Sequence, residues 1–352
     1  MPRFIPIPPF RPPRLLRNPH TQTLIGAYGH RKRYRCGQDM HLVELHDGDR
    51  LVLHDDAPAG WEPGGPTALF LHGLLGCHIS PYVARCAAKL KKLGFRTFRI
   101  DYRGTGAGRD FAERPYHAGL SEDIVAALSE IARLCPASPI ALIGYSMGGN
   151  LALKTLGQHA EELPDVPIRG VAVNPAVDLA QCCFQLKNRT QRMYDRFFAR
   201  GLTANVLSRP ELFGDVFDEI ASRPPKRIVE FDRRVTVPLW GFRSTKDYYR
   251  QASAISYIDR IKVPTLVLHS KDDPLIPWKI FESFTFNPQL QLHLSDHGGH
   301  MGYFAKSSES PDGWWADYRI IEWLKPLQES RIARPLSFPA VVPGPTAIRL
   351  PR

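Results

Sequence analysis

The sequence lacks the features that would place the protein in a membrane or in a secretory pathway. None of its apolar runs reaches the length of about 18 residues that a transmembrane helix requires. The N-terminal segment is interrupted by prolines and has no apolar core of the kind found in signal peptides. We therefore expect a cytoplasmic protein.

Cysteine is scarce, and its spacing gives no indication of a metal site. The six cysteines form no C-x-x-C pair, which is a common spacing of zinc ligands. The neighbours Cys182 and Cys183 are interpreted as packing residues. The sequence therefore predicts no metal site and no organic cofactor.

Acidic residues are absent from both ends of the chain. Residues 1–36 contain eight Lys or Arg and residues 331–352 contain four Arg, whereas the part between them has 34 basic and 35 acidic residues. The net charge of +11 therefore comes from the two Pro-rich ends. Such basic, partly apolar segments can contact an anionic membrane surface; the alternative, which we favour, is an arm that wraps its own domain. No nucleic-acid-binding module accompanies the charge, so nucleic acid is not an expected partner.

Short apolar runs alternate with helix-like stretches along most of the chain. The runs predict strands at 67–71, 97–100, 139–143, 170–173, 265–269 and 289–294, and a hairpin is expected over 41–54. Strands that alternate with helices indicate an α/β fold with a mostly parallel central sheet and helices on both faces. Asp101 and Arg103, after one of these strands, are expected to pair structurally rather than to react.

The alternation stops over residues 177–260, a stretch rich in aromatic and charged residues with no clear strand. We interpret it as a cap inserted between two late strands, on the side of the sheet where ligands bind in such folds. The expected organisation is an N-terminal arm (1–36), a core made of 37–176 and 261–330, the cap (177–260) and a C-terminal tail (331–352).

The segment Gly144-Tyr145-Ser146-Met147-Gly148 connects a predicted strand to a predicted helix. Strand, Gly-flanked serine and helix in this order form the nucleophile elbow, a sharp turn that exposes the serine hydroxyl. The sequence therefore predicts Ser146 as a nucleophile in an α/β-hydrolase fold.

A serine needs a base to take its proton and an acid to orient that base. In this fold an acid and then a histidine follow late strands. Asp272 and Asp273 follow one such strand, and His297 and His300 follow the next. We favour Asp273, which precedes a proline, and His300, which two glycines allow to fold back; Asp272 and His297 remain the alternatives.

The oxyanion of the reaction needs two preorganised donors. One is expected to be the backbone N–H of Met147, directly after the nucleophile. The other is expected from the loop His72-Gly73-Leu74-Leu75-Gly76 after the first core strand, namely the backbone N–H of Leu74.

Together these motifs resemble those of the YheT-like α/β-hydrolases, bacterial relatives of the eukaryotic α/β-hydrolase-domain acylglycerol lipases and phospholipid esterases. The resemblance implies that Ser146, Asp273 and His300 form a catalytic triad. The matching segments are spread over roughly residues 15–328 and include 18–23 (NPHTQT), 72–74 (HGL), 82–83 (YV), 103–104 (RG), 116–119 (YHAG), 122–123 (ED), 144–150 (GYSMGGN), 230–232 (EFD), 241–242 (GF), 247–249 (DYY), 272–274 (DDP) and 297–303 (HGGHMGY).

The chain departs from the family pattern at several positions. Cys77-His78 stand where the family often has Gly-Ser, and Thr105 follows Arg103-Gly104 where the family usually has Cys. An H-x-x-x-x-D motif linked to acyl transfer in some relatives does not start at His300, because Ala305 fills its last position.

The resulting hypothesis is a serine carboxylic-ester hydrolase that works through an acyl-enzyme. The aromatic cap favours a small-molecule ester with an apolar acyl group, such as a lipid. Two other hypotheses remain: an acyltransferase that uses the same triad, and a non-catalytic binding protein with this fold.

Overall fold

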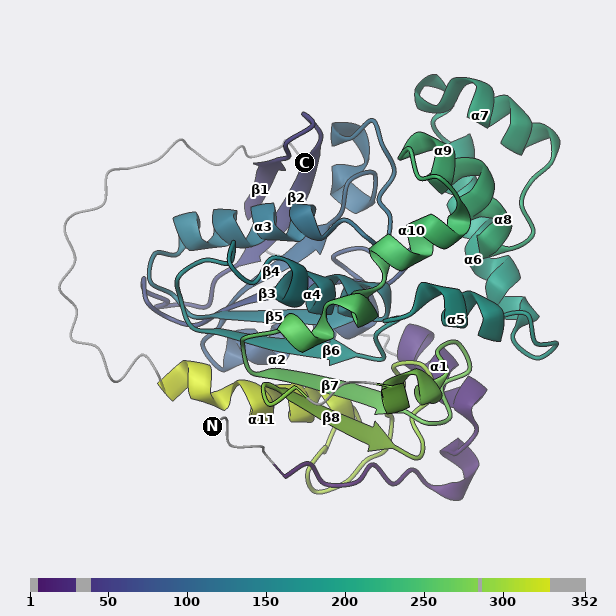
Figure 1. Ribbon diagram of the computed structural model, residues 1–352. Helices are drawn as coiled ribbons and strands as arrows, with labels where there is room; N and C mark the ends of the chain where they lie inside the picture. The colour runs from purple at the N-terminus through teal and green to yellow at the C-terminus, as the bar shows by residue number, and fades with distance from the viewer. Residues whose placement is uncertain (1–5, 30–38, 284–286, 330–352) are drawn as a thin grey trace.

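The computed structural model of the protein describes residues 6–29, 39–283 and 287–329 (Figure 1). The predicted C-terminal tail (331–352) and parts of the predicted N-terminal arm (1–5 and 30–36) lie outside the described residues. None of the described helices is long and apolar enough to cross a membrane.

One eight-stranded sheet forms the centre of the fold, with the strand order β1-β2-β4-β3-β5-β6-β7-β8. The first two strands form the expected hairpin, and β2 also pairs antiparallel with β4, whereas all later pairings are parallel. The strands are β1 (Asp39–Glu44), β2 (Arg50–Asp56), β3 (Thr67–Leu71), β4 (Arg96–Asp101), β5 (Ile140–Tyr145), β6 (Ile168–Val173), β7 (Thr265–Ser270) and β8 (Leu290–Ser295).

The central strands read as continuous apolar runs because both faces of the sheet are covered. Successive side chains of β3 enter different cores: Leu69 and Leu71 belong to one apolar cluster, and Ala68 and Phe70 to the other. The first cluster is completed by helices α3 (Ser121–Leu134) and α4 (Met147–Gln158), and the second by α2 (Pro81–Lys92) and α11 (Trp315–Glu329), which lie on opposite sides of the sheet (Figure 1). The predicted α/β architecture is confirmed.

Residues 177–260 contain helices and no strand, and most of them lie beyond the carboxyl ends of the parallel strands, whereas the turns at Ala254–Ser256 and Ile258–Arg260 run back along α4 (Figure 1). They have a small apolar core of their own, centred on Val206, Phe213 and Val235. The helices are α5 (Leu179–Gln185), α6 (Arg192–Leu207), α7 (Pro210–Ser222), α8 (Ile228–Phe231), a π-helical turn (Asp232–Thr236), α9 (Val237–Leu239) and α10 (Thr245–Ala252). Below we call this segment the cap.

Several connections are 3-10 turns. One of them, Trp278–Ser283, lies in the connection between β7 and β8. The others are Arg14–Leu16, Gly106–Phe111, Ala254–Ser256 and Ile258–Arg260.

The N-terminal residues contact the core rather than standing apart from it. Phe10 is buried, with its ring centroid 5.6 Å from those of Tyr303 and Trp315. Helix α1 (Pro19–Tyr28) then begins at Asn18, whose side chain accepts hydrogen bonds from two backbone N–H groups of the first turn. In contrast, Leu15 is 93% exposed.

The structure pairs Asp101 and Arg103 with other residues and not with each other: Asp101 accepts hydrogen bonds from His54 and His78, and Arg103 forms ion pairs. The Arg103 guanidinium is fully buried and contacts the carboxylates of Asp47, Asp49 and Asp123 at 2.7–2.8 Å. Its contact with Asp123 is bidentate, the geometry that best offsets the cost of burying both charges.

Candidate active site

Ser146 stands on the turn between β5 and α4 in a strained backbone conformation, with φ 55° and ψ −119°. A non-glycine residue adopts positive φ rarely, and such strain concentrates at functional sites. A Cβ on Gly144 would lie 2.1 Å from the Gly148 carbonyl oxygen, and one on Gly148 would lie 2.5 Å from the His72 carbonyl oxygen. Glycine is therefore required on both sides of the serine.

His300 and Asp273 meet Ser146 from two loops at the same edge of the sheet. His300 Nε2 lies 2.9 Å from Ser146 Oγ, and His300 Nδ1 lies 2.8 Å from Asp273 Oδ2. Both His300 and Asp273 are buried. The three side chains predicted as a triad thus form one hydrogen-bonded row.

Asp273 is held as a carboxylate by its surroundings. Burial alone would raise its pKa, but the charge and hydrogen bond of His300 and backbone hydrogen bonds outweigh burial, so the pKa is lowered from its usual value. The backbone N–H groups of Leu275 and Ile276 donate to Oδ1 at 2.8 and 3.1 Å. A buried carboxylate with this many donors stays ionised at neutral pH.

Asp272 and His297, the alternatives to this pair, lie beside each other and away from Ser146. Asp272 Oδ1 accepts a hydrogen bond from the backbone N–H of Gly299 at 2.8 Å, and Oδ2 is 3.4 Å from His297 Nδ1. Burial raises the pKa of Asp272 above its usual value, in contrast to Asp273. Asp272 therefore braces the loop that carries His300.

Asn174 is a site residue that sequence reasoning missed. It follows β6 with φ 45°, and its Nδ2 donates to Asp273 Oδ2 at 2.7 Å and to the Gly299 carbonyl at 3.2 Å. It thereby connects the two loops that carry Asp273 and His300. Its position directly after a core strand was the available signal.

Helix α1 also contacts the histidine loop, which sequence reasoning missed. Thr23 Oγ1 accepts a hydrogen bond from the His300 backbone N–H at 2.9 Å and donates to the Pro19 carbonyl at 2.7 Å. Gln22 Nε2 donates hydrogen bonds to the carbonyls of Leu16 and Phe304, and Gln22 Oε1 accepts one from the Phe304 N–H. The segment at 18–23, noted above only as part of the family resemblance, was the signal.

The loop after β3 lies against the nucleophile. A Cβ on Gly73 would lie 3.2 Å from the Ser146 Cβ, so only glycine lets the loop approach this closely without displacing a neighbour. Tyr82 Oη accepts from the Gly73 N–H at 3.0 Å, and Tyr116 Oη accepts from the Leu75 N–H at 2.9 Å. These two phenols hold the loop in place on either side of Leu74.

A cavity of about 120 Å³ opens at this point, between the core and the cap. Ser146 and His300 line it together with the two expected oxyanion donors, Leu74 and Met147. The rest of the wall is mostly apolar and comes largely from the cap; it includes Leu179, Cys182, Cys183, Leu186, Phe198, Leu202, Ile228 and Phe231. An apolar group attached to a carbonyl would find a matching environment there.

One buried carboxyl interrupts this apolar wall. Asp232 lines the cavity, and its two oxygens accept hydrogen bonds from Tyr249 Oη at 2.7 Å and Thr236 Oγ1 at 2.9 Å. Burial raises its pKa to about 6, against the opposing effect of these two hydrogen bonds.

Comparison with known proteins gives a consistent picture. A family model described as alpha/beta hydrolase fold matches residues 66–307. The chain is 30% identical over 325 residues to the putative esterase YheT of Escherichia coli (strain K12), covering 92% of this chain and 94% of that protein. It is 28% identical over 264 residues to phospholipase ABHD3 of Homo sapiens, covering 74% and 63%.

Among solved structures, an esterase of Pyrococcus furiosus matches with a TM-score of 0.52 and 19% identity, covering 82% of this chain and 90% of that one. A 2,6-dihydroxy-pseudo-oxynicotine hydrolase matches with a TM-score of 0.51 and 15% identity, covering 84% and 66%. At these identities the structural matches support the fold and nothing finer.

Proposed function

The chain belongs to the α/β-hydrolase family, in its YheT-like branch, and we propose that it is a serine carboxylic-ester hydrolase whose triad is Ser146, Asp273 and His300. Relatives named esterase and phospholipase support the ester-hydrolase class. The observation that carries the proposed site is the hydrogen-bonded row from Ser146 Oγ through His300 to Asp273 at the mouth of the apolar cavity.

In the first half of the proposed reaction, Ser146 Oγ attacks the ester carbonyl carbon while His300 Nε2 takes the hydroxyl proton. The tetrahedral intermediate then expels the alcohol, to which His300 returns that proton, and an acyl-enzyme remains. In the second half, His300 takes a proton from water, the resulting hydroxide attacks the acyl carbon, and the acid leaves as Ser146 regains its proton. Asp273 keeps the His300 ring oriented and stabilises the imidazolium in both halves.

The backbone N–H groups of Leu74 and Met147 are proposed to bind the oxyanion. The support is that both residues line the cavity beside Ser146 and that Met147 is the first residue of α4. An N–H in the first turn of a helix has no partner within the helix and is aligned with the positive end of its dipole.

The proposed substrate class is an ester with an apolar acyl group, such as a lipid. The apolar wall contributed by the cap supports this proposal, as does the name of the phospholipase relatives. Contact between the basic ends and an anionic membrane stays a prediction; in the described part of the N-terminal arm, the exposed Leu15 is an apolar side chain available for it.

The test is hydrolysis of p-nitrophenyl esters of graded acyl length by wild type, Ser146→Ala and the control Ser222→Ala, which changes an exposed serine of the cap. We expect Ser146→Ala to lose roughly 10⁴- to 10⁶-fold in kcat and the control to retain full activity. Hydrolysis by Ser146→Ala at the wild-type rate would refute the proposed nucleophile.

Labelling with a fluorophosphonate distinguishes a wrong substrate from a wrong site. Modification of wild type at Ser146 without any p-nitrophenyl hydrolysis would keep the nucleophile and reject the substrate class. Product analysis with added alcohols separates hydrolysis from acyl transfer, because a transferase would form a new ester instead of the free acid. Absence of both labelling and hydrolysis would favour a binding protein.

A further inference from the structure

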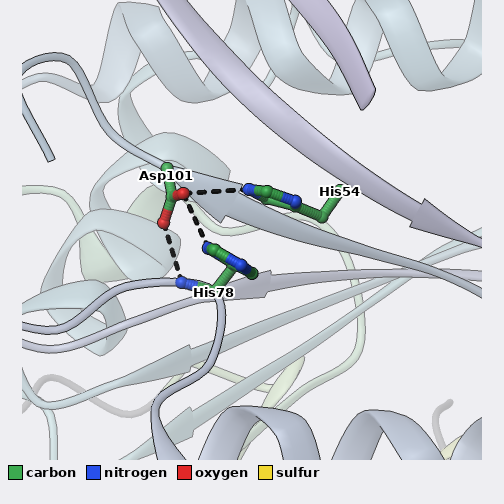
Figure 2. A group of neighbouring side chains, drawn as sticks. All are labelled: His54, His78 and Asp101. Atoms are coloured by element: carbon green, nitrogen blue, oxygen red, sulfur yellow. Dashed lines mark hydrogen bonds and ion pairs between the residues drawn. The ribbon is translucent and has the colours of Figure 1, made fainter. Parts of the chain in front are cut away.

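Two histidines and an aspartate form a compact cluster apart from the proposed catalytic site (Figure 2). His54 Nε2 lies 2.9 Å from Asp101 Oδ2, and His78 Nδ1 lies 2.7 Å from the same oxygen. The two imidazole rings are stacked, with centroids 3.4 Å apart and planes 14° from parallel. Both rings therefore present a nitrogen to one carboxylate oxygen from the same side.

The cluster is assembled by the sheet and by one loop. His54 belongs to β2 and Asp101 ends β4, which pair antiparallel with Val52 opposite Asp101. His78 comes from the connection between β3 and α2. More than twenty residues separate each of the three from the next, so no local spacing motif and no cysteine pair in the sequence indicates the group.

Asp101 is fixed in its orientation before any ligand arrives. Its Oδ1 accepts from the His78 backbone N–H at 2.8 Å, and its Oδ2 also accepts from the Ala107 N–H at 2.8 Å. A Cβ on Gly106 would lie 2.3 Å from Oδ2, so glycine is needed for the chain to fold around the carboxylate. A carboxylate held this firmly presents the same oxygen to both rings.

We propose that His54 Nε2, His78 Nδ1 and Asp101 Oδ2 bind a divalent first-row transition metal ion of the Zn²⁺ type, with water completing the coordination. All three atoms lie within 4.8 Å of one another. Ligands about 2.0 Å from a tetrahedral Zn²⁺ are separated by roughly 3.3 Å. The present N–O separations of 2.7 and 2.9 Å need to widen by only about half an ångström to admit the ion.

The donor set suits this class of metal. Imidazole nitrogen favours Zn²⁺, Cu²⁺, Ni²⁺ and Fe²⁺ over Mg²⁺ or Ca²⁺, and two histidines with one carboxylate leave positions open for water. Asp101 Oδ2 can only accept, so His54 Nε2 and His78 Nδ1 carry protons in the ion-free structure. Each of these two nitrogens must give up its proton to bind the ion, and the neutral ring then carries its remaining proton on the nitrogen that faces away from the ion. The carboxylate reduces the net charge that the site must hold.

The burial of the three side chains also fits a metal site with an entry path. The Asp101 and His54 side chains are 0% and 5% exposed, whereas that of His78 is 17% exposed. An ion can therefore reach the cluster from solvent on the His78 side, and this ring can shift to receive it.

The consequence of metal binding is expected to be structural. None of the three is among the residues that line the cavity at Ser146, so the metal takes no part in the proposed ester chemistry. His78 follows Leu74 by only four residues, in the same connection between β3 and α2. A metal bound there would tie this connection to β2 and β4 and stabilise the folded state by RT ln(1 + c/Kd), where c is the free metal concentration.

The experiment uses untagged, EDTA-treated full-length protein titrated with Zn²⁺ by isothermal calorimetry, with bound metal measured after desalting. Wild type is expected to take up about one equivalent and to show a raised Tm in Zn²⁺. His78→Ser is expected to bind at least about 100-fold more weakly and to lose the Tm shift. The control His46→Ala, which changes an exposed histidine outside the cluster, is expected to behave as wild type.

Two results would overturn the proposal. One is a wild-type protein that takes up no Zn²⁺ at 100 µM, a concentration at which a built three-ligand site should be occupied. The other is a His78→Ser variant that binds as wild type does. If His78→Ser does not fold, Co²⁺ bound to wild type decides, because Co²⁺ in a four- or five-coordinate protein site absorbs visible light much more strongly than six-coordinate hydrated Co²⁺. Bound Co²⁺ with only the weak absorption of the hydrated ion would also overturn the proposal.

Discussion

Replacing Asp273 by Asn, and separately Asp272 by Asn, tests the proposed site with two changes of equal size at adjacent positions. Each substitution removes one negative charge and replaces one carboxylate oxygen by an NH₂ group. The two carboxylates differ in what they contact. Asp273 accepts a hydrogen bond from His300 Nδ1 at 2.8 Å, whereas Asp272 accepts one from the Gly299 N–H and has Oδ2 3.4 Å from His297 Nδ1.

Four groups donate hydrogen bonds to the Asp273 carboxylate, and they determine the effect of Asp273→Asn. The backbone N–H groups of Leu275 and Ile276 bind Oδ1, so the amide oxygen of the variant is expected to remain there and its NH₂ group to face His300 and Asn174. An NH₂ group can only donate, which forces His300 to accept at Nδ1 and to carry its proton on Nε2. In that tautomer His300 cannot take the Ser146 proton.

We therefore expect Asp273→Asn to lower kcat about 10⁴-fold, which corresponds to roughly 5 kcal/mol of transition-state stabilisation. Asp272→Asn keeps an acceptor for the Gly299 N–H and leaves the His300 ring untouched, so its loss is expected to stay below about tenfold.

The assay is the initial rate of ester hydrolysis across pH 5–9, with the Tm of each variant as a check on folding. Equal losses in the two variants, or a larger loss for Asp272→Asn, would show that the assignment of the acid is wrong. A loss in Asp273→Asn that disappears at high pH would also contradict the tautomer argument, because high pH does not restore an acceptor at position 273.

Three further predictions concern the support of the site. Gln22→Ala removes three hydrogen bonds, two of them to Phe304 in the histidine loop, and is expected to cost about 2–4 kcal/mol in urea denaturation and to lower kcat more than it changes KM. Arg103→Met leaves the buried carboxylate of Asp123 without its cation and is expected to lower the free energy of unfolding by about 3–5 kcal/mol; a loss below 1 kcal/mol would contradict this. Since burial raises the Asp232 pKa to about 6, wild-type stability from this group is present below pH 3.8 and is lost as pH rises through 6. The amide in Asp232→Asn does not titrate, so the variant should not lose this stability. From pH 4 to pH 7 the difference in the free energy of unfolding between variant and wild type, measured from denaturation curves, should therefore shift by up to about 3 kcal/mol in favour of the variant.

Features encoded in consecutive residues could be predicted from the sequence. The strand–serine–helix turn spans five residues, and its glycines are required by contacts of 2.1 and 2.5 Å that any Cβ would make there. The alternation of apolar runs and helix-like stretches predicted the parallel sheet, because strands buried on both faces have to be apolar throughout. The order of Ser146, Asp273 and His300 could be derived because each follows a strand of that sheet.

Contacts between distant segments depended on the tertiary structure. Asp272 and Asp273 are adjacent in sequence, yet the turn after β7 directs one toward His297 and the other toward His300. The contact of Thr23 with the loop of His300 spans 277 residues. No local pattern records such a distance.

The sequence by itself thus determined the sheet, the elbow and the short set of candidates for the acid and the base, since each depends on neighbours within one strand or turn. The tertiary structure decided which candidates meet, how Asn174 and helix α1 support them, and that His54, His78 and Asp101 converge on one oxygen. The physical reason is that hydrogen bonds and metal ligation act over about 2–3 Å in space, and only the packing of strands and loops brings residues that are far apart in the chain within that range.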